Sequence, residues 1–295
     1  MPGLSLRGRI AGAPISLGVS EAPGGGHEIG ATPVLTEMAA LGLRATELGP
    51  TGYLGATPAE VRARLDEHGL RLIGGFLPVP LHMQAGLDLS EAEQAIATLG
   101  AAGAEVVVLA ARSTDGSYDR KLSLSDDEWL VLLGNLHRLD KLIADHGMRT
   151  TLHPHVGTAI ENRQSVLRLL ESSDVGLCLD TGHLLIGGMQ PLELLERFAG
   201  RVGHVHLKDV RTGVAGPVAA DRVSYLDAVR AGLYAPLGAG DLDIAAIVAA
   251  LEAAGYQGWY VLEQDNALDG EPAAGQGPIL DAGRSIDYLL AATGA

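Results

Sequence analysis

Two neighbouring segments of the chain carry polar side chains that could do chemistry. The first, 175–180, is an apolar run that ends in Asp180. The second, 202–209, alternates apolar residues with three polar ones, which are His204, His206 and Lys208. If both segments are β-strands, residues two apart share a face, so these three side chains point the same way. Charged and imidazole groups are costly to bury without partners, and a divalent metal ion is a partner that suits them.

Further candidates stand at or just after the ends of apolar runs, and these are Glu47, His153, His155, His183 and Glu263. Each has a purely structural explanation when taken alone. A single His at a strand end is more often a hydrogen-bonded structural residue, Asp180 could cap the following loop, and Glu47 could cap a helix. Lys208 could form a surface ion pair with Asp209, which contributes little stability. Their joint occurrence at several strand ends is not required by any of these explanations.

Eight apolar runs alternate with eight helical patterns along the chain. We expect strands at 10–19, 43–48, 71–77, 105–110, 149–155, 175–180, 202–209 and 258–263. We expect helices from Thr32-Pro33 onward and at 57–68, 90–99, 125–146, 162–172 and 191–198, then from Asp241 or Asp243 to 254, and at 279–291. Strict alternation indicates parallel strands joined by crossover helices.

Eight such units in 295 residues predict a (β/α)₈ TIM barrel that forms a single domain over 1–295. A doubly wound sheet is the competing fold, but it normally carries a Gly-rich fingerprint after its first strand, and this chain has none. Catalytic groups of a TIM barrel sit at the carboxyl ends of its strands, where the candidates above would converge. Mixed carboxylate and imidazole ligands suit Mn²⁺, Co²⁺, Fe²⁺, Zn²⁺ or Mg²⁺ better than Ca²⁺. With no cysteine expected nearby, a closed structural zinc site is not expected.

The bulk composition excludes some classes of partner. A net charge of −15 argues against nucleic acid and against an anionic membrane surface. No apolar run is long enough for a membrane span or a signal peptide, and the lone Cys178 excludes an internal disulfide, so we expect a cytoplasmic protein. The thiol lies in an apolar run and is expected to be a small buried side chain.

Two loops are candidates for contact with a substrate. The Gly-rich stretch 21–27 lacks the spacing of a phosphate-binding loop and is expected to be a mobile active-site loop. The long irregular stretch 210–240, with a short helix near 224–232, is expected to be a lid that brings Arg222 and Tyr225 to the substrate.

Six motifs together carry a family resemblance, and these are Ala13-Pro-Ile-Ser, Ala45-Thr-Glu-Leu-Gly-Pro50, His153-Pro-His-Val-Gly-Thr158 with Glu161, Leu179-Asp-Thr-Gly-His183, His204-Val-His-Leu-Lys-Asp209 and Leu237-Gly-Ala-Gly-Asp241. With them the chain resembles, over nearly its whole length, the xylose-isomerase-like family of sugar isomerases and epimerases. Within that family it is similar to the inosose (2-keto-myo-inositol) dehydratases.

The resemblance implies a divalent ion, most simply Mn²⁺ or Co²⁺, bound by residues that end the last four strands. Asp180, His206 and Glu263 match that pattern. The isomerases and epimerases usually have a glutamate on the fifth strand, where this chain has His153 or His155. We take His153 as the fourth ligand, with Glu161 as the alternative.

The resemblance further implies β-elimination of water from a cyclic polyol ketone after enolisation at the metal. Lys208, if desolvated beside the metal, could polarise an oxygen or transfer a proton at a lowered pKa. The other candidates for proton transfer and hydroxyl binding are His155, His183, Glu47 and Glu161, among which acid and base are left open.

Three alternatives remain open at this stage. A keto-sugar isomerase or epimerase would use the same site, as would a 3-dehydroshikimate-type dehydratase, and a non-catalytic sugar-binding scaffold would keep only the fold. In every case the expected partner is a small polyol or keto-sugar, with a homo-oligomer possible.

Overall fold

The computed structural model describes residues 5–19, 26–83 and 88–294. Eight parallel strands close into a barrel in the order β1-β10-β7-β6-β5-β4-β3-β2. They are β1 (Ile10–Gly12), β2 (Ala45–Glu47), β3 (Arg71–Pro78), β4 (Val106–Ala110), β5 (Arg149–Leu152), β6 (Gly176–Asp180), β7 (Val202–Leu207) and β10 (Tyr260–Leu262). The predicted (β/α)₈ barrel is confirmed.

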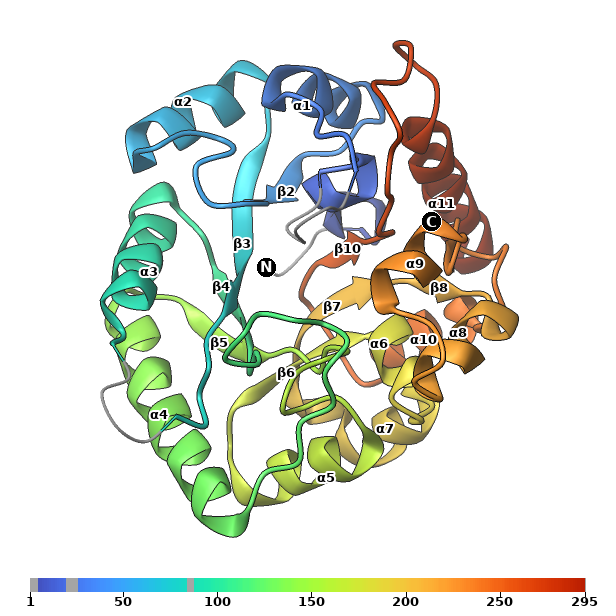
Figure 1. Cartoon of the computed structure of the whole chain (residues 1–295). Coiled ribbons are helices and arrows are strands. Elements are labelled where there is room, and N and C mark those ends of the chain that lie inside the picture. The colour runs from blue at the N-terminus through green and yellow to red at the C-terminus, as the bar shows by residue number, and fades with distance from the viewer. Residues whose placement is uncertain (1–4, 20–25, 84–87, 295) are drawn as a thin grey trace.

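A ring of helices surrounds the barrel, as the view along its strands shows (Figure 1). The helices that follow the eight strands are α1 (Ala31–Ala40), α2 (Pro58–Glu67), α3 (Ser90–Ala102), α4 (Asp126–Asp145), α5 (Arg163–Ser172), α7 (Pro191–Phe198), α10 (Ile244–Ala253) and α11 (Pro278–Thr293). In α4, the buried positions recur every three or four residues, at Trp129, Leu132, Leu136, Leu139 and Ile143. This spacing packs one face of the helix against the sheet.

Local signals in the sequence start several of these helices. Thr57 and Glu60 form a reciprocal capping box at α2, and Ser125 and Glu128 form another at α4. Such a box satisfies backbone N–H groups that the first turn leaves without partners. No helix among the described residues is long and apolar enough to cross a membrane.

Several element boundaries differ from the prediction. The first strand ends at Gly12 rather than at residue 19, because Pro14 opens a 3₁₀ helix, Pro14–Leu17, that turns the chain away from the sheet. The fifth strand ends at Leu152, so His153 lies just beyond it. A further short helix, α6 (Thr181–Ile186), follows β6 at once where a loop was expected.

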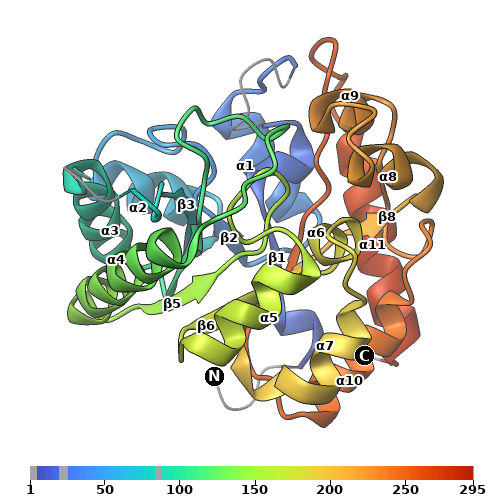
Figure 2. The same cartoon turned by 60° about the horizontal axis from the view of Figure 1, so that its bottom comes forward.

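The stretch 210–240, which was expected to be mostly irregular, contains several helices and strands. It contains α8 (Thr212–Ala219) and α9 (Tyr225–Arg230), and a small antiparallel sheet of β8 (Asp209–Val210) and β9 (Tyr234–Ala235) encloses them. The two helices contact each other and lie side by side in both views (Figures 1 and 2). We call 209–235 the α8–α9 insertion.

Asp209 anchors the base of this insertion. Its buried carboxylate accepts hydrogen bonds from the backbone N–H groups of Gly238, Gly240 and Leu242, at 2.8 to 3.1 Å. A Cβ on Gly240 would lie 2.2 Å from Asp209 Oδ1, so only glycine allows this close approach. Asp209 is therefore an internal anchor and not part of a surface ion pair with Lys208.

Candidate active site

Four buried side chains meet at the carboxyl end of the barrel. They are His153, Asp180, His206 and Glu263, and one potential ligand atom from each lies within 4.8 Å of those of the other three. Four consecutive strands of the closed sheet, β5, β6, β7 and β10, place them there. Because the strands are parallel, all of these carboxyl ends open at the same side of the barrel.

The donor atoms of this cluster lie close together without hydrogen bonds. Asp180 Oδ2 lies 3.4 Å from His153 Nε2 and 3.7 Å from His206 Nδ1, and His206 Nδ1 contacts Glu263 Oε2 directly. Asp180 Oδ2, His206 Nδ1 and Glu263 Oε2 are fully buried and have no hydrogen-bond partner among the described residues. Buried polar atoms are normally paired, so this convergence fits a divalent metal ion.

Backbone and carboxylate partners fix both imidazole rings. His153 Nδ1 lies 2.7 Å from the carbonyl oxygen of Pro154, and His206 Nε2 lies 2.9 Å from Glu47 Oε1. If each of these nitrogens carries the proton, the other nitrogen presents its lone pair to the cluster. Metal-binding histidines are usually oriented by such partners.

Glu47 lies behind the cluster and faces two histidines. Its Oε1 also contacts His204 Nε2 at 2.7 Å. Burial alone would raise the pKa of Glu47, but the adjacent His206 and His204 hold it well below its ordinary value. The ionised carboxylate can therefore orient His206, although Glu47 also lines the pocket described below.

Asp180 has two separate contacts. While Oδ2 points into the cluster, Oδ1 accepts the backbone N–H of His183 at 2.8 Å and caps α6. One side chain of Asp180 therefore both caps α6 and belongs to the candidate metal-binding cluster.

Lys208 is fully buried among carboxylates. Its Nζ lies 2.8 Å from Glu263, 2.9 Å from Asp265 and 3.5 Å from Asp180. Burial lowers the pKa of Lys208, but these three carboxylates outweigh that effect and raise it well above its ordinary value. The expected lowering of this pKa is wrong, because the side chain is surrounded by opposite charge rather than by apolar groups alone.

His155 and His183 stack on each other, with ring centroids 3.8 Å apart. Burial and the nearby His153 lower the pKa of His155 to about 3, and burial also holds the pKa of His183 well below its ordinary value. Both rings are therefore neutral. The Nδ1 of His155 lies 2.8 Å from the carbonyl oxygen of Val156, so its Nε2 can act as a proton acceptor.

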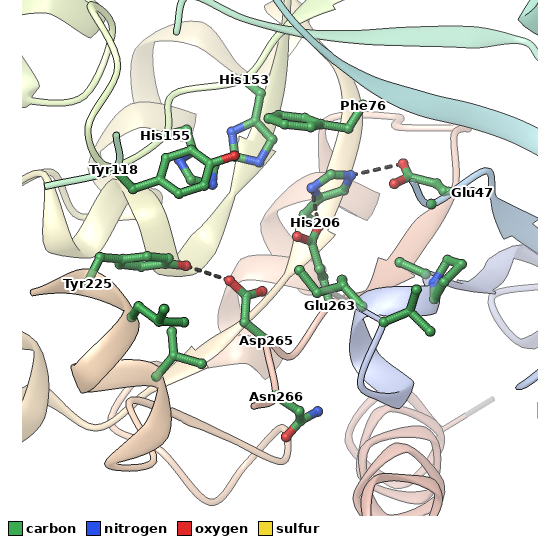
Figure 3. Close-up of a pocket in the computed structure, with 17 residues that line it drawn as sticks. Glu47, Phe76, Tyr118, His153, His155, His206, Tyr225, Glu263, Asp265 and Asn266 are labelled. Carbon is green, nitrogen blue, oxygen red and sulfur yellow. Dashed lines mark hydrogen bonds and ion pairs between the residues drawn. The ribbon is translucent and has the colours of Figure 1, made fainter. Parts of the chain in front are cut away.

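A pocket lined by both polar and apolar side chains opens at the cluster (Figure 3). Its polar lining comes from Glu47, Tyr118, His153, His155, His206, Tyr225, Glu263, Asp265 and Asn266. Its apolar lining includes Ala13, Pro14, Ile15, Val19, Phe76, Leu226 and Val229. Pockets that combine apolar lining with a few converging polar groups are typical binding sites for small molecules.

Asp265 was not among the sequence candidates. It lies in the pocket two residues beyond Glu263, and its carboxylate joins Lys208 to the hydroxyl of Tyr225. Asp265 lies beyond the predicted strand 258–263, and beyond β10, which ends at Leu262. The signal in the sequence is a second carboxylate two residues after Glu263, at the same end of the strand.

Asp180, His183 and Lys208 are buried and do not line this pocket, and neither do two other candidates, Arg222 and Glu161. Arg222 is exposed, and Glu161 accepts the backbone N–H of Gly157 at 3.1 Å. Both line a neighbouring cavity, which shares only Tyr118 and Tyr225 with the main pocket. Burial raises the pKa of Glu161. Tyr225, in contrast, is buried in the main pocket, as Figure 3 shows.

Two further expectations concern the surroundings of the site. Most of the Gly-rich stretch 21–27 falls on residues 20–25, which lie outside the described residues. Cys178 is buried as expected. Contrary to expectation, however, its sulfur belongs to a possible ligand group with His153 and His206, so a cysteine does lie near the cluster.

Comparison with known proteins finds relatives that match most of the chain. A model of the xylose isomerase-like TIM barrel family matches residues 35–288. A protein of Geobacillus thermodenitrificans named inosose dehydratase is 35% identical over 269 residues, which cover 87% of this chain and 90% of the relative. A second protein of that name, from Lacticaseibacillus casei, is 31% identical over 267 residues, which cover 86% of this chain and 88% of that relative.

A solved structure shows the same fold at lower identity. The probable 3-DHS dehydratase AsbF of Bacillus anthracis has a TM-score of 0.67 at 16% identity, covering 95% of this chain and 98% of that one. At such identity the likeness concerns the fold alone. The family match and the relatives above 30% identity show that the chain belongs to the xylose isomerase-like TIM barrel family, together with its inosose dehydratases.

Proposed function

We propose that the protein is a metal-dependent dehydratase that eliminates water from a neutral cyclic polyol ketone such as 2-keto-myo-inositol. The observation that carries this proposal is the set of buried ligand atoms without hydrogen bonds at the floor of the pocket. The relatives named inosose dehydratase, which cover most of the chain, support the choice of reaction.

In this proposal the metal, Mn²⁺ or Co²⁺, is held by His153, Asp180, His206 and Glu263. Bound there, a divalent ion would act as a Lewis acid that favours enolisation of the substrate ketone. Glu47 keeps His206 aimed at the ion, and Lys208 holds the carboxylate of Glu263 in place.

Within the pocket, His155 is our candidate for proton transfer. It lines the pocket as a neutral imidazole, and its Nε2 is available as an acceptor. His183 stacks against it and keeps its ring in place. A general base must lie within hydrogen-bond reach of the proton that it removes, and the place of His155 in the pocket meets this requirement.

The charges around the pocket favour an uncharged substrate. No Lys or Arg is among the lining residues, and the stretches outside the described part, 1–4, 20–25, 84–87 and 295, contain none in their sequence. A substrate carboxylate would face Glu47, Glu263 and Asp265 without a cationic partner on the wall. This argues against a 3-dehydroshikimate-type substrate, which carries a carboxylate, and leaves a neutral keto-sugar epimerase or isomerase as the second candidate.

An activity assay tests the proposal. The purified protein, stripped of metal and then given Mn²⁺ or Co²⁺, is incubated with 2-keto-myo-inositol, and the appearance of an absorbing unsaturated diketone is followed. We expect product only with metal, and none from a Glu263→Gln variant. Interconversion of ketohexoses without any elimination would instead favour the epimerase or isomerase.

A further inference from the structure

Tyr225 and Asp265 form a hydrogen-bonded pair on the side of the pocket away from Glu47 (Figure 3). Tyr225 reaches the pocket from α9, and Asp265 reaches it from the segment after β10. The tyrosine hydroxyl lies 2.5 Å from Asp265 Oδ2. The two residues are 40 positions apart in the sequence, and their hydrogen bond lies in the pocket. Local structure therefore does not explain it.

Both partners are held in place by other contacts. The opposite carboxylate oxygen of Asp265 lies 2.9 Å from the ammonium of Lys208, so Oδ2 faces the tyrosine and accepts its O–H. The backbone N–H of Tyr225 donates to Asp119 at 2.7 Å, and its hydroxyl oxygen lies 2.9 Å from the hydroxyl of Tyr234. The ring is buried, with the rings of His155 and His183 less than 6 Å away.

The hydrogen-bond capacity of Tyr225 then defines what it can recognise. A phenol has one O–H to donate and two lone pairs to accept with. Its proton goes to Asp265, and the hydroxyl of Tyr234 occupies one lone pair. The lone pair that remains can only accept, so it fits a hydrogen-bond donor such as a hydroxyl group of the substrate.

The surroundings sharpen this recognition. Leu226 and Val229 lie on the same helix and line the same pocket, so Tyr225 is a polar group within an apolar stretch of wall. A ligand that covers this wall without offering a hydroxyl would bury the acceptor unpaired. Sites built to bind a hydroxyl reject analogues that lack it far more strongly than apolar pockets reject a changed methylene.

We propose that the Tyr225–Asp265 pair is a specificity-determining subsite that recognises one ring hydroxyl of the substrate, and that Asp265 positions the tyrosine. This inference rests on the proposed dehydratase function and names the part of the site that distinguishes a polyol from its deoxy analogue. Tyr225 contacts the substrate in this proposal, whereas Asp265 acts as a positioning residue.

The test compares 2-keto-myo-inositol with a set of its monodeoxy analogues in the metal-loaded protein. For the wild type we expect kcat/KM to fall at least about 100-fold for one analogue in the set. Tyr225→Phe should lower kcat/KM on the parent compound by a similar factor while changing it little on that analogue. Asp265→Asn should behave in the same way, and the double variant should be no worse than the more impaired single variant.

A matched pair elsewhere in the chain provides the control. The hydroxyl of Tyr260 donates to Glu252 at 2.5 Å, and Glu252 also pairs with Arg9, which repeats the tyrosine, carboxylate and cation arrangement outside the pocket. Tyr260→Phe should leave the discrimination between parent and analogue unchanged. If Tyr225→Phe lowers kcat/KM equally for all substrates, the subsite does not exist.

Calorimetric binding of myo-inositol and its monodeoxy analogues separates this inference from the proposed function. Hydroxyl-dependent binding that is lost in Tyr225→Phe, without any elimination by the wild type, would overturn the dehydratase and support the subsite. Normal elimination with no preference among the analogues, in turnover and in binding, would overturn the subsite alone. Absence of both binding and turnover would overturn both.

Discussion

At the scale of single residues, Asp180 has one oxygen in the candidate metal-binding cluster, while the other accepts a backbone N–H of α6. Asp180→Asn should keep the oxygen that caps α6, whereas Asp180→Ala removes it. We therefore expect the alanine variant to be about 1 kcal/mol less stable than the asparagine variant without metal. Both variants should lose the stabilisation that Mn²⁺ gives the wild type, because both lack the ligand carboxylate.

Thermal melts with and without Mn²⁺, at fixed protein concentration, would measure both effects. If Mn²⁺ raises the midpoint of either variant as much as that of the wild type, Asp180 does not bind the metal. If the two variants are equally stable without metal, the cap at His183 contributes nothing measurable.

Residue types and strand periodicity predicted most of the candidate site, but not its contacts. The sequence singles out Asp180, His206 and Glu263, which the structure brings together. It could not show that Glu47 faces His206 from 159 positions away, since such a contact depends on closure of the barrel. The pKa of Lys208 is raised rather than lowered for the same reason, because closure of the barrel brings Asp180, Asp265 and Glu263 around its ammonium group.

At the scale of secondary-structure elements, the α8–α9 insertion is tied to the loop between β4 and α4. Asp119 in that loop accepts the N–H of Tyr225, and Lys121 pairs with Asp221 at 3.0 Å while donating to the carbonyl of Ala219. These contacts hold α9 over the pocket. They connect the position of Tyr225 to a loop about 100 residues earlier in the chain.

Asp119→Ala should therefore loosen α9 without unfolding the barrel. We expect faster amide hydrogen exchange at 225–230 and a higher KM, with exchange in α4 unchanged. Asp115→Ala is the matched control, since Asp115 accepts bonds within the same loop, from Ser113 and Ser117. Equal exchange at 225–230 in all three proteins would show that the Asp119 contact does not hold the helix.

The alternation of strands and helices was readable from apolar periodicity, whereas the small elements were not. Helix α6 has only six residues, too few for a periodic pattern. Helix α8 contains Pro217 together with Gly213 and Gly216, which disfavour helix in isolation. Its contacts with α6 and α9 must stabilise it. Such tertiary contacts cannot be predicted from the residues of the helix alone.

At the scale of the whole molecule, the buried histidines make the metal-free protein sensitive to acid. The pKa of His155 is about 3 in the fold, against 6.5 as its ordinary value, and those of His183 and His204 are also lowered by burial. Below pH 6.5 the unfolded chain binds protons that the folded chain does not, so stability falls as pH falls.

The other ionisable groups of the cluster act in both directions. Burial alone would raise the pKa of Glu263, but the charges of His206 and Lys208 outweigh burial and lower it to about 2. The contribution of Glu263 to the free energy of unfolding is therefore lost as pH falls below 4.5. His206 opposes the trend, because its raised pKa gives a contribution that is present below pH 6.5 and lost as pH rises. Between pH 7 and pH 5, the loss of stability caused by His155, His183 and His204 is larger than the gain caused by His206.

We therefore expect the free energy of unfolding, measured by urea denaturation in the presence of a chelator, to be lower at pH 5 than at pH 7. His155→Gln should reduce this difference, since it removes one of the histidines that must stay neutral. A wild-type midpoint that is the same at both pH values would contradict the assignment of neutral buried imidazoles.

The position of Cys178 makes its thiol a natural probe of local opening of the barrel. It is the only cysteine of the chain, it lies in the middle of β6 with no exposed surface, and burial raises its pKa to about 11. A thiol reagent in solution can reach this sulfur only when the sheet parts, since the reactive thiolate is both hidden and scarce. The rate at which a thiol reagent labels Cys178 thus reports how often the barrel opens locally. Comparing this rate with and without a metal ion shows how far the metal slows that opening.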